Sequence, residues 1–207
     1  LTALTAWQGL IDVLEAQAGQ TLLITGGSGS FGQMAVPIAR ELGLRVMVTG
    51  NARAREEFLA MGAERYIDYR QENYWESVSG VDIVIDTLGA GEFEHEISVL
   101  KRGGRLLSLR TSPNGEFARR NGFPWYKRAL FTLAGMKYDL SARRQDKEYR
   151  FVFVHADGAQ LRRITEIVER NHIVPAVDPH TFSLEEINDA MRLVAEGPIN
   201  GKVIVRM

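Results

Sequence analysis

The chain has 207 residues, of which 45% are hydrophobic and 25% are charged, a composition typical of globular proteins. Its formal net charge of −1 argues against a general binder of nucleic acid or acidic membranes. The absence of cysteine excludes disulfide bonds and thiolate metal sites. Because no run of about 18 apolar residues and no secretion signal is found, we expect no membrane contact and a cytoplasmic location.

The first predicted element is a helix. Apolar residues recur at helical spacing from Leu4 to Leu14, and Gly19 follows them. Because this pattern begins almost at Leu1, which is not a methionine, we expect the chain to be part of a longer protein. Chemistry encoded upstream would then lie outside this sequence.

Strands and helices alternate over most of the remaining chain. Short apolar runs predict buried strands, and longer segments with helical periodicity follow them. This alternation predicts an α/β fold, a Rossmann-type doubly wound parallel sheet with helices on both faces. The predicted strands are Thr21–Thr25, Arg45–Thr49, Tyr66–Ile67, Val81–Asp86, Gly104–Leu109 and Phe151–Val154, and the predicted helices are Phe31–Leu42, Arg53–Met61, Glu92–Leu100, Trp125–Met136 and Ala159–Arg170.

The last part of the chain has a different pattern. A charged loop is predicted at Ser141–Arg150. After the last long helix, an extended segment, a helix with a capping-box pattern at Ser183 and Glu186, and a strand at Gly201–Arg206 form a strand-helix-strand tail. We therefore divide the chain into a nucleotide-binding domain, residues 1–172, and a C-terminal segment, residues 173–207.

A glycine-rich loop follows the first predicted strand and opens a helix. It fits G-x-G-x-x-G, in which the glycines allow a tight turn, a close approach of backbone to a diphosphate, and close packing of helix on strand. The helix start adds unpaired N–H groups for the phosphates. The residues predicted to bind the diphosphate are Gly27, Ser28, Gly29, Ser30, Phe31 and Gly32.

The residues after the second predicted strand favour NADPH over NADH. NAD enzymes usually carry an acidic residue there for the ribose hydroxyl. This chain has Asn51 there, which we predict to bind the cofactor, and no acid appears before Glu56. Arg53 and Arg55 suit a 2′-phosphate, although both also fit solvent-exposed helix positions.

The same loop also fits T-G-x-x-G-x-x-G, the pattern of extended short-chain dehydrogenases and nucleotide-sugar epimerases. Those enzymes need a Tyr-x-x-x-Lys pair for proton transfer. No tyrosine in this chain has a lysine four residues later. The four histidines are scattered, no nucleophile or acid–base pair is recognisable, and no catalytic residue or metal ligand is assigned.

Eight motifs, the glycine loop among them, occur along the chain in a fixed order. These motifs and their order resemble the medium-chain dehydrogenase/reductase superfamily, in its zinc-free quinone oxidoreductase-like branch. The resemblance covers nearly the whole chain, although Gly26-Gly27 and Arg110 depart from the usual residues. The motifs are Leu4–Trp7, the glycine loop, Met61–Glu64, Ile67–Tyr69, Gly80–Gly89, Leu100–Leu106, Phe182–Leu184 and Gly201–Val205.

The resemblance implies a catalytic domain upstream of Leu1, to which part of the tail would belong. In those members of the family that bind zinc, the zinc ligands lie mostly in that upstream part. It also agrees with a homodimer joined through the apolar Phe151–Val154 segment, which we expect at the sheet edge. Beyond the glycine loop, the cofactor-binding residues that it implies are Thr5, Tyr69, Leu88, Gly89, Ser108, Leu109, Arg110, Phe153 and Val154.

The sequence therefore predicts an NADPH-dependent oxidoreductase that transfers hydride to a quinone, an enone or a related activated carbonyl compound. The partner is a small-molecule substrate, and no metal is expected within this chain. Two alternatives stay open: a zinc-dependent alcohol dehydrogenase-type member with its metal site upstream, and a non-catalytic NADPH-binding module.

Overall fold

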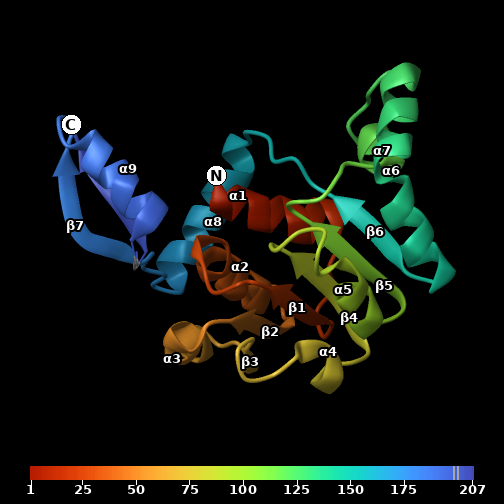
Figure 1. Cartoon of the computed structure of the whole chain (residues 1–207), viewed down its shortest axis with the longest axis horizontal. Helices are drawn as coiled ribbons and strands as arrows, with labels where there is room; N and C mark the ends of the chain where they lie inside the picture. Colours follow the sequence, from red (N-terminus) through yellow and green to blue (C-terminus); the bar gives the residue numbers. More distant parts are fainter. Residues whose placement is uncertain (198, 200) are drawn as a thin grey trace.

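The computed structural model describes residues 1–197, 199 and 201–207 and shows an α/β fold with a parallel six-stranded sheet (Figure 1). The strand order is β3-β2-β1-β4-β5-β6, and all five neighbouring pairs are parallel. The predicted doubly wound fold is confirmed. The strands are β1 (Thr21–Thr25), β2 (Arg45–Gly50), β3 (Arg65–Asp68), β4 (Val81–Asp86), β5 (Leu100–Ser108) and β6 (Glu148–Phe151).

Helices cover both faces of this sheet, and each face has its own apolar core. One core lies under α1, α2, α3 and α8, and the other under α4, α5, α6 and α7. The continuous apolar runs of the central strands fill both cores at once. The helices are α1 (Thr2–Trp7), the π-helix η1 (Gln8–Val13), α2 (Ser30–Glu41), the 3-10 helix η2 (Ala52–Ala54), α3 (Arg55–Ala60), α4 (Tyr74–Ser77), α5 (Phe93–Val99), α6 (Gly115–Arg120), α7 (Trp125–Arg144) and α8 (Gly158–Arg170).

The predicted charged loop at Ser141–Arg150 is wrong. Helix α7 continues to Arg144, because Ala142 is fully buried in the core and the basic side chains of the last turn suit the negative end of the helix dipole. Strand β6 then begins at Glu148. Arg143, Arg144, Asp146 and Glu148 are exposed, whereas Lys147 is buried.

The predicted strand Phe151–Val154 is also wrong in its bounds. Strand β6 ends at Phe151, which pairs with Ser108, the last residue of β5. The hydroxyl of Ser108 accepts hydrogen bonds from the N–H groups of Arg110 and Thr111, so the chain after β5 turns away. Residues 152–154 therefore have no neighbouring strand to pair with. The expected position at the sheet edge is confirmed, since β6 ends the strand order.

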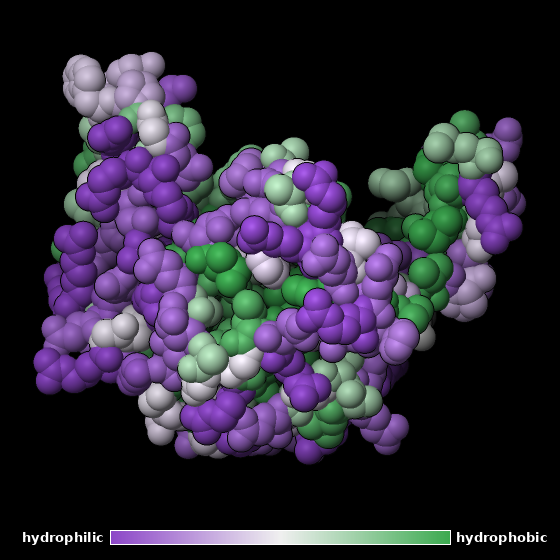
Figure 2. Space-filling view, turned by 180° about the vertical axis from the view of Figure 1, so that it is seen from behind, coloured by the Kyte–Doolittle hydropathy of each residue, from purple (hydrophilic) through white to green (hydrophobic). Residues whose placement is uncertain are grey.

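The C-terminal segment forms a small unit of its own. β7 (Val177–Ser183) and β8 (Lys202–Arg206) pair in parallel and are connected through α9 (Ile187–Glu196). The Glu186 carboxylate accepts from the N–H of Ser183, which is one half of the predicted capping box. This unit stands away from the main sheet (Figure 1), and its surface carries many apolar side chains (Figure 2).

No helix in the described part of the chain is both long and apolar enough to cross a membrane.

Candidate functional site

The carboxyl ends of the six parallel strands meet at one edge of the sheet, and most of the predicted cofactor residues follow these strand ends. The strand order reverses between β1 and β4, where open α/β sheets bind ligands. The glycine loop follows β1, and Leu88 and Gly89 follow β4. Leu109 and Arg110 follow β5, and residues 51, 69 and 153–154 follow β2, β3 and β6.

The glycine loop packs tightly at one glycine and is open at another. A Cβ on Gly32 would lie 1.7 Å from the carbonyl oxygen of Gly27, so the helix start touches the loop backbone there. A Cβ on Gly29 would have no neighbour within 4 Å. No side chain caps the start of α2, and its first N–H groups have no partner within the helix. The loop thus leaves space and free donors where a diphosphate would bind.

The loops after β1, β4 and β5 contact one another. A Cβ on Gly26 would lie 2.4 Å from Leu88 Cδ2, and the Thr87 hydroxyl donates to the carbonyl oxygens of Thr25 and Gly26 at 2.8 and 3.1 Å. Gly89 has a φ of +103°, and its Cβ would lie 3.6 Å from Cβ of Arg110. The structure therefore brings the predicted residues of these three loops together.

A buried carboxylate holds two of these loops. Asp86 Oδ1 accepts hydrogen bonds from the N–H groups of Leu88 and Gly89, both at 2.7 Å. Its Oδ2 accepts from the Ser108 hydroxyl at 2.5 Å. Asp86 and Ser108 are fully buried. Ser108, predicted to line the cofactor, therefore supports the loop from below with its side chain.

Tyr66 of β3 contacts the glycine loop at Ser28 and the end of β2. Its hydroxyl donates to the carbonyl oxygen of Asn51 at 2.7 Å and interacts with Ser28, and burial raises its pKa. A Cβ on Gly50 would lie 2.1 Å from this hydroxyl oxygen. Strand β2 thus ends in a glycine pressed between Tyr66 and Ser28, where an acid would stand in a typical NAD site.

The two predicted arginines differ in their surroundings. Both are exposed, and the Arg55 guanidinium donates to the carbonyl oxygen of Tyr66 at 3.1 Å. The N–H of Arg53 donates to the Asn51 side chain, which caps η2. In the described part of the chain the Arg53 guanidinium has no hydrogen-bond partner, so it is free to pair with a ligand. Tyr69, at the end of β3, is 56% exposed.

Three predicted residues lie further out. The Thr5 hydroxyl donates to the carbonyl oxygen of Leu1 within the first helix. Phe153 is 73% exposed and borders a small cavity of about 140 Å³ between η1 and the segment after β6. Val154 is partly buried beside it. No hydrogen bond or ion pair in the described part of the chain joins these residues to the glycine loop, and their cofactor roles stay predictions.

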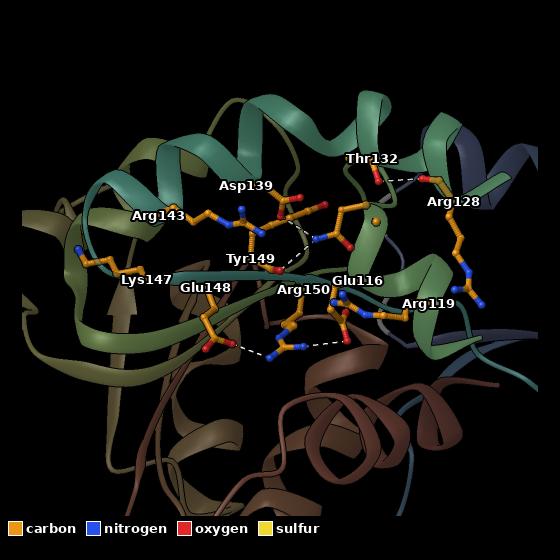
Figure 3. A pocket seen from close by; sticks show the side chains of 12 residues that line it. Glu116, Arg119, Arg128, Thr132, Asp139, Arg143, Lys147, Glu148, Tyr149 and Arg150 are labelled. Atoms are coloured by element: carbon orange, nitrogen blue, oxygen red, sulfur yellow. Dashed lines mark hydrogen bonds and ion pairs between the residues drawn. The ribbon is translucent and has the colours of Figure 1, made fainter. Parts of the chain in front are cut away.

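A cavity of about 710 Å³ lies between α6, α7 and β6 (Figure 3). Its twelve lining residues include none of the predicted cofactor residues. Arg150 spans it, with ion pairs of 2.8 Å to Glu116 and 2.5 Å to Glu148, and Asn114 donates to Asp139 at 2.7 Å. Because none of the predicted cofactor residues lines this cavity, we place the dinucleotide site at the glycine loop instead.

Sequence reasoning missed the buried polar residues behind the loops, Thr25, Asp86 and Glu96. Glu96 lies on α5 next to Ile97, on the helix face that Phe93 and Ile97 bury. An acidic residue on the apolar face of a helix was a recognisable signal. Within residues 1–197, 199 and 201–207, no group of three His, Asp or Glu side chains is arranged to hold a metal ion.

Comparison with known proteins places these features in context. Residues 61–205 match the family model described as zinc-binding dehydrogenase. The chain is 28% identical to one component of the phenolphthiocerol/phthiocerol polyketide synthase of Mycobacterium tuberculosis, over 98% of the chain and 9% of that protein. It is 25% identical to 2-methylene-furan-3-one reductase of Solanum lycopersicum, over 97% of the chain and 44% of that protein.

The fold is shared with the quinone oxidoreductase of Coxiella burnetii. The TM-score is 0.79 at 24% identity, covering 100% of the chain and 58% of that structure. The chain thus spans less than two thirds of the length of each of these proteins.

Proposed function

This chain belongs to the zinc-binding dehydrogenase family, as the match over residues 61–205 shows, and we propose that it is the dinucleotide-binding part of an NADPH-dependent oxidoreductase. The match confirms the resemblance to the medium-chain dehydrogenase/reductase superfamily. The observation that carries the proposal is the open glycine loop at the point where the strand order reverses. The substrate class we propose is a quinone, an enone or a related activated carbonyl compound.

In such a reaction the bound NADPH supplies the hydride, and the protein supplies binding and orientation. The N–H groups at the start of α2 would bind the diphosphate, because they carry partial positive charge and have no partner in the helix. Leu88, Gly89 and Arg110 would border the next part of the cofactor. The substrate class is supported by the similarity to a reductase named for an exocyclic enone.

The full-length protein tests this function. We expect it to oxidise NADPH in the presence of quinones or enones, and the isolated chain of 207 residues to turn over little or nothing. The measurement is loss of NADPH absorbance, with and without a zinc chelator. Chelator-sensitive alcohol oxidation would instead favour the zinc-dependent alternative, and NADPH binding without turnover of any of these substrates would favour a non-catalytic module.

The isolated chain is expected to bind NADPH about tenfold more tightly than NADH, because Arg53 can pair with the 2′-phosphate and no acid repels it. Arg53→Ala should remove most of this preference. Arg162→Ala, which changes an exposed arginine on α8, is the matched control and should leave the preference unchanged. Fluorescence titration measures both constants, and tighter binding of NADH would contradict the proposal.

We also propose a homodimer joined through the edge strand β6 and the segment after it. An unpaired edge strand invites another chain, and Phe153 exposes 73% of its surface beside that edge. Light scattering at high micromolar concentration should give twice the chain mass, and Phe153→Asp should shift the chain toward monomer. Leu161→Asp, on an exposed apolar residue of α8, is the control. A monomeric wild-type chain would argue against this dimer.

A further inference from the structure

Three buried polar residues form a row across neighbouring strands just below the glycine loop. Thr25 of β1 pairs in register with Asp86 of β4, and Asp86 pairs with Ser108 of β5. All three are 0% exposed. Register partners in a parallel sheet point to the same face, which here is the face that α5 covers. Each of the three strands leads directly into one of the predicted cofactor loops.

Glu96 of α5 covers this row. Its Oε1 lies 2.5 Å from the Thr25 hydroxyl oxygen, and the residue is 0% exposed. Its Oε2 is buried and has no hydrogen-bond partner in the described part of the chain, and the Asp86 carboxyl group is close enough to interact with the Glu96 carboxyl group. Two carboxyl groups can form a hydrogen bond only when one of them carries a proton.

The charges around Glu96 decide where that proton resides. Asp86 already accepts three hydrogen bonds, whereas Glu96 accepts one, from Thr25, so Glu96 is the carboxyl group with an oxygen free to donate. Two other titratable groups that act on Glu96 are Glu92, the N-cap residue of α5, and Tyr74 on α4, and neither is a cation.

Lys147 lies close to this part of α5, and its charge has other partners. The ammonium of Lys147 donates to the carbonyl oxygens of Ile97 and Ser98. Burial, followed by the charge of Asp86, raises the pKa of Glu96 to about 9. Glu96 is thus a neutral acid at neutral pH, beside the carboxyl group of Asp86.

We propose that Glu96, by donating a hydrogen bond from its protonated carboxyl to Asp86 while contacting Thr25, is a positioning residue that holds the glycine loop and the loops after β4 and β5 in register. Dinucleotide affinity then depends on one buried proton. Loss of this proton places two like charges against each other in a buried site and separates the loops. The inference rests on the proposed dinucleotide site.

Glu96→Gln tests the proposal, because its amide can donate to Asp86 and accept from Thr25 but has no proton to lose. At pH 7 we expect NADPH affinity within about twofold of the wild type. Between pH 7 and 10 the wild-type affinity should fall at least about fivefold, with its midpoint near the pKa of about 9, while that of E96Q stays level. Glu96→Ala should bind at least about tenfold more weakly at pH 7. An equal fall with pH in E96Q, or wild-type affinity in E96A, would overturn the proposal.

Unfolding provides a readout that needs no ligand. The folded chain keeps the Glu96 proton up to about pH 9, whereas the unfolded chain releases it near the ordinary value of 4.5. The stabilisation is therefore complete below pH 4.5 and is lost as the pH rises to 9, by about tenfold in the unfolding constant per pH unit. The ratio of wild-type to E96Q unfolding constants should show this slope.

Dinucleotide binding and unfolding together separate a failure of the proposed function from a failure of the Glu96 assignment. A wild-type chain that binds neither NADPH nor NADH overturns the proposed function and, with it, the role of Glu96 in binding. The unfolding slope then still decides whether Glu96 carries the shared proton, and a ratio that does not change with pH overturns that assignment too.

Discussion

Gly32→Ala is expected to lower the free energy of unfolding by about 3 kcal/mol or more. The added methyl group would lie 1.7 Å from the carbonyl oxygen of Gly27 and 2.9 Å from Cε1 of the buried Phe58. The first of these atoms is backbone, so the start of α2 would have to move away from the loop. Urea unfolding followed by circular dichroism measures the loss, and NADPH binding should be lost with it.

Gly29→Ala is the matched control within the same loop. Gly29 has ordinary backbone angles, φ −100° and ψ −169°, and a Cβ there meets no protein atom within 4 Å. Stability should therefore change by less than about 1 kcal/mol. The methyl group would instead occupy the space proposed for the diphosphate, so NADPH affinity should fall about tenfold or more. Unchanged NADPH affinity in G29A would contradict the proposed position of the cofactor.

Asp86→Ala is expected to destabilise the fold by about 3 kcal/mol and to weaken NADPH binding at least tenfold. The substitution leaves the N–H groups of Leu88 and Gly89 and the hydroxyl of Ser108 without their acceptor. Both loops that leave β4 and β5 lose their anchor. Thermal unfolding and fluorescence titration measure the two effects.

Asp82→Ala, at the opposite end of the same strand, separates a general loss of stability from a loss of the site. Asp82 accepts from the N–H of Thr21 at 2.8 Å and pairs with Lys101, away from the glycine loop. D82A should lower stability by about 1 kcal/mol and leave NADPH affinity unchanged. If D86A bound NADPH as tightly as D82A, Asp86 would have no part in forming the site.

The strand pattern was predictable because each central strand is buried on both faces. Strands β1 and β4 have their predicted bounds, and the others lie within a few residues of theirs or, at β6, overlap in part. The glycine loop was equally clear, since its spacing is set by local backbone geometry. Segments that mix polar and apolar residues were harder to predict. Helix α7 has few buried residues, so the sequence of its charged end resembled that of a loop.

The polar row under the loops could not be predicted in the same way. Thr25, Asp86 and Ser108 lie more than 20 residues apart in sequence, and only the sheet register makes them neighbours. Glu96 reaches them from a helix whose packing no local pattern specifies. The same register ends β6 at Phe151, because β5 turns away after Ser108.

The sequence by itself determined the alternation of strands and helices, the glycine loop and the absence of an acid after β2, because these depend on local periodicity and on which residue occupies a turn. Only the tertiary structure decided which loops touch, which predicted residues support the site from below, and where a proton must reside. Those properties depend on burial and on distances between residues far apart in the chain, and two carboxyl groups share a proton only once folding has removed both from water.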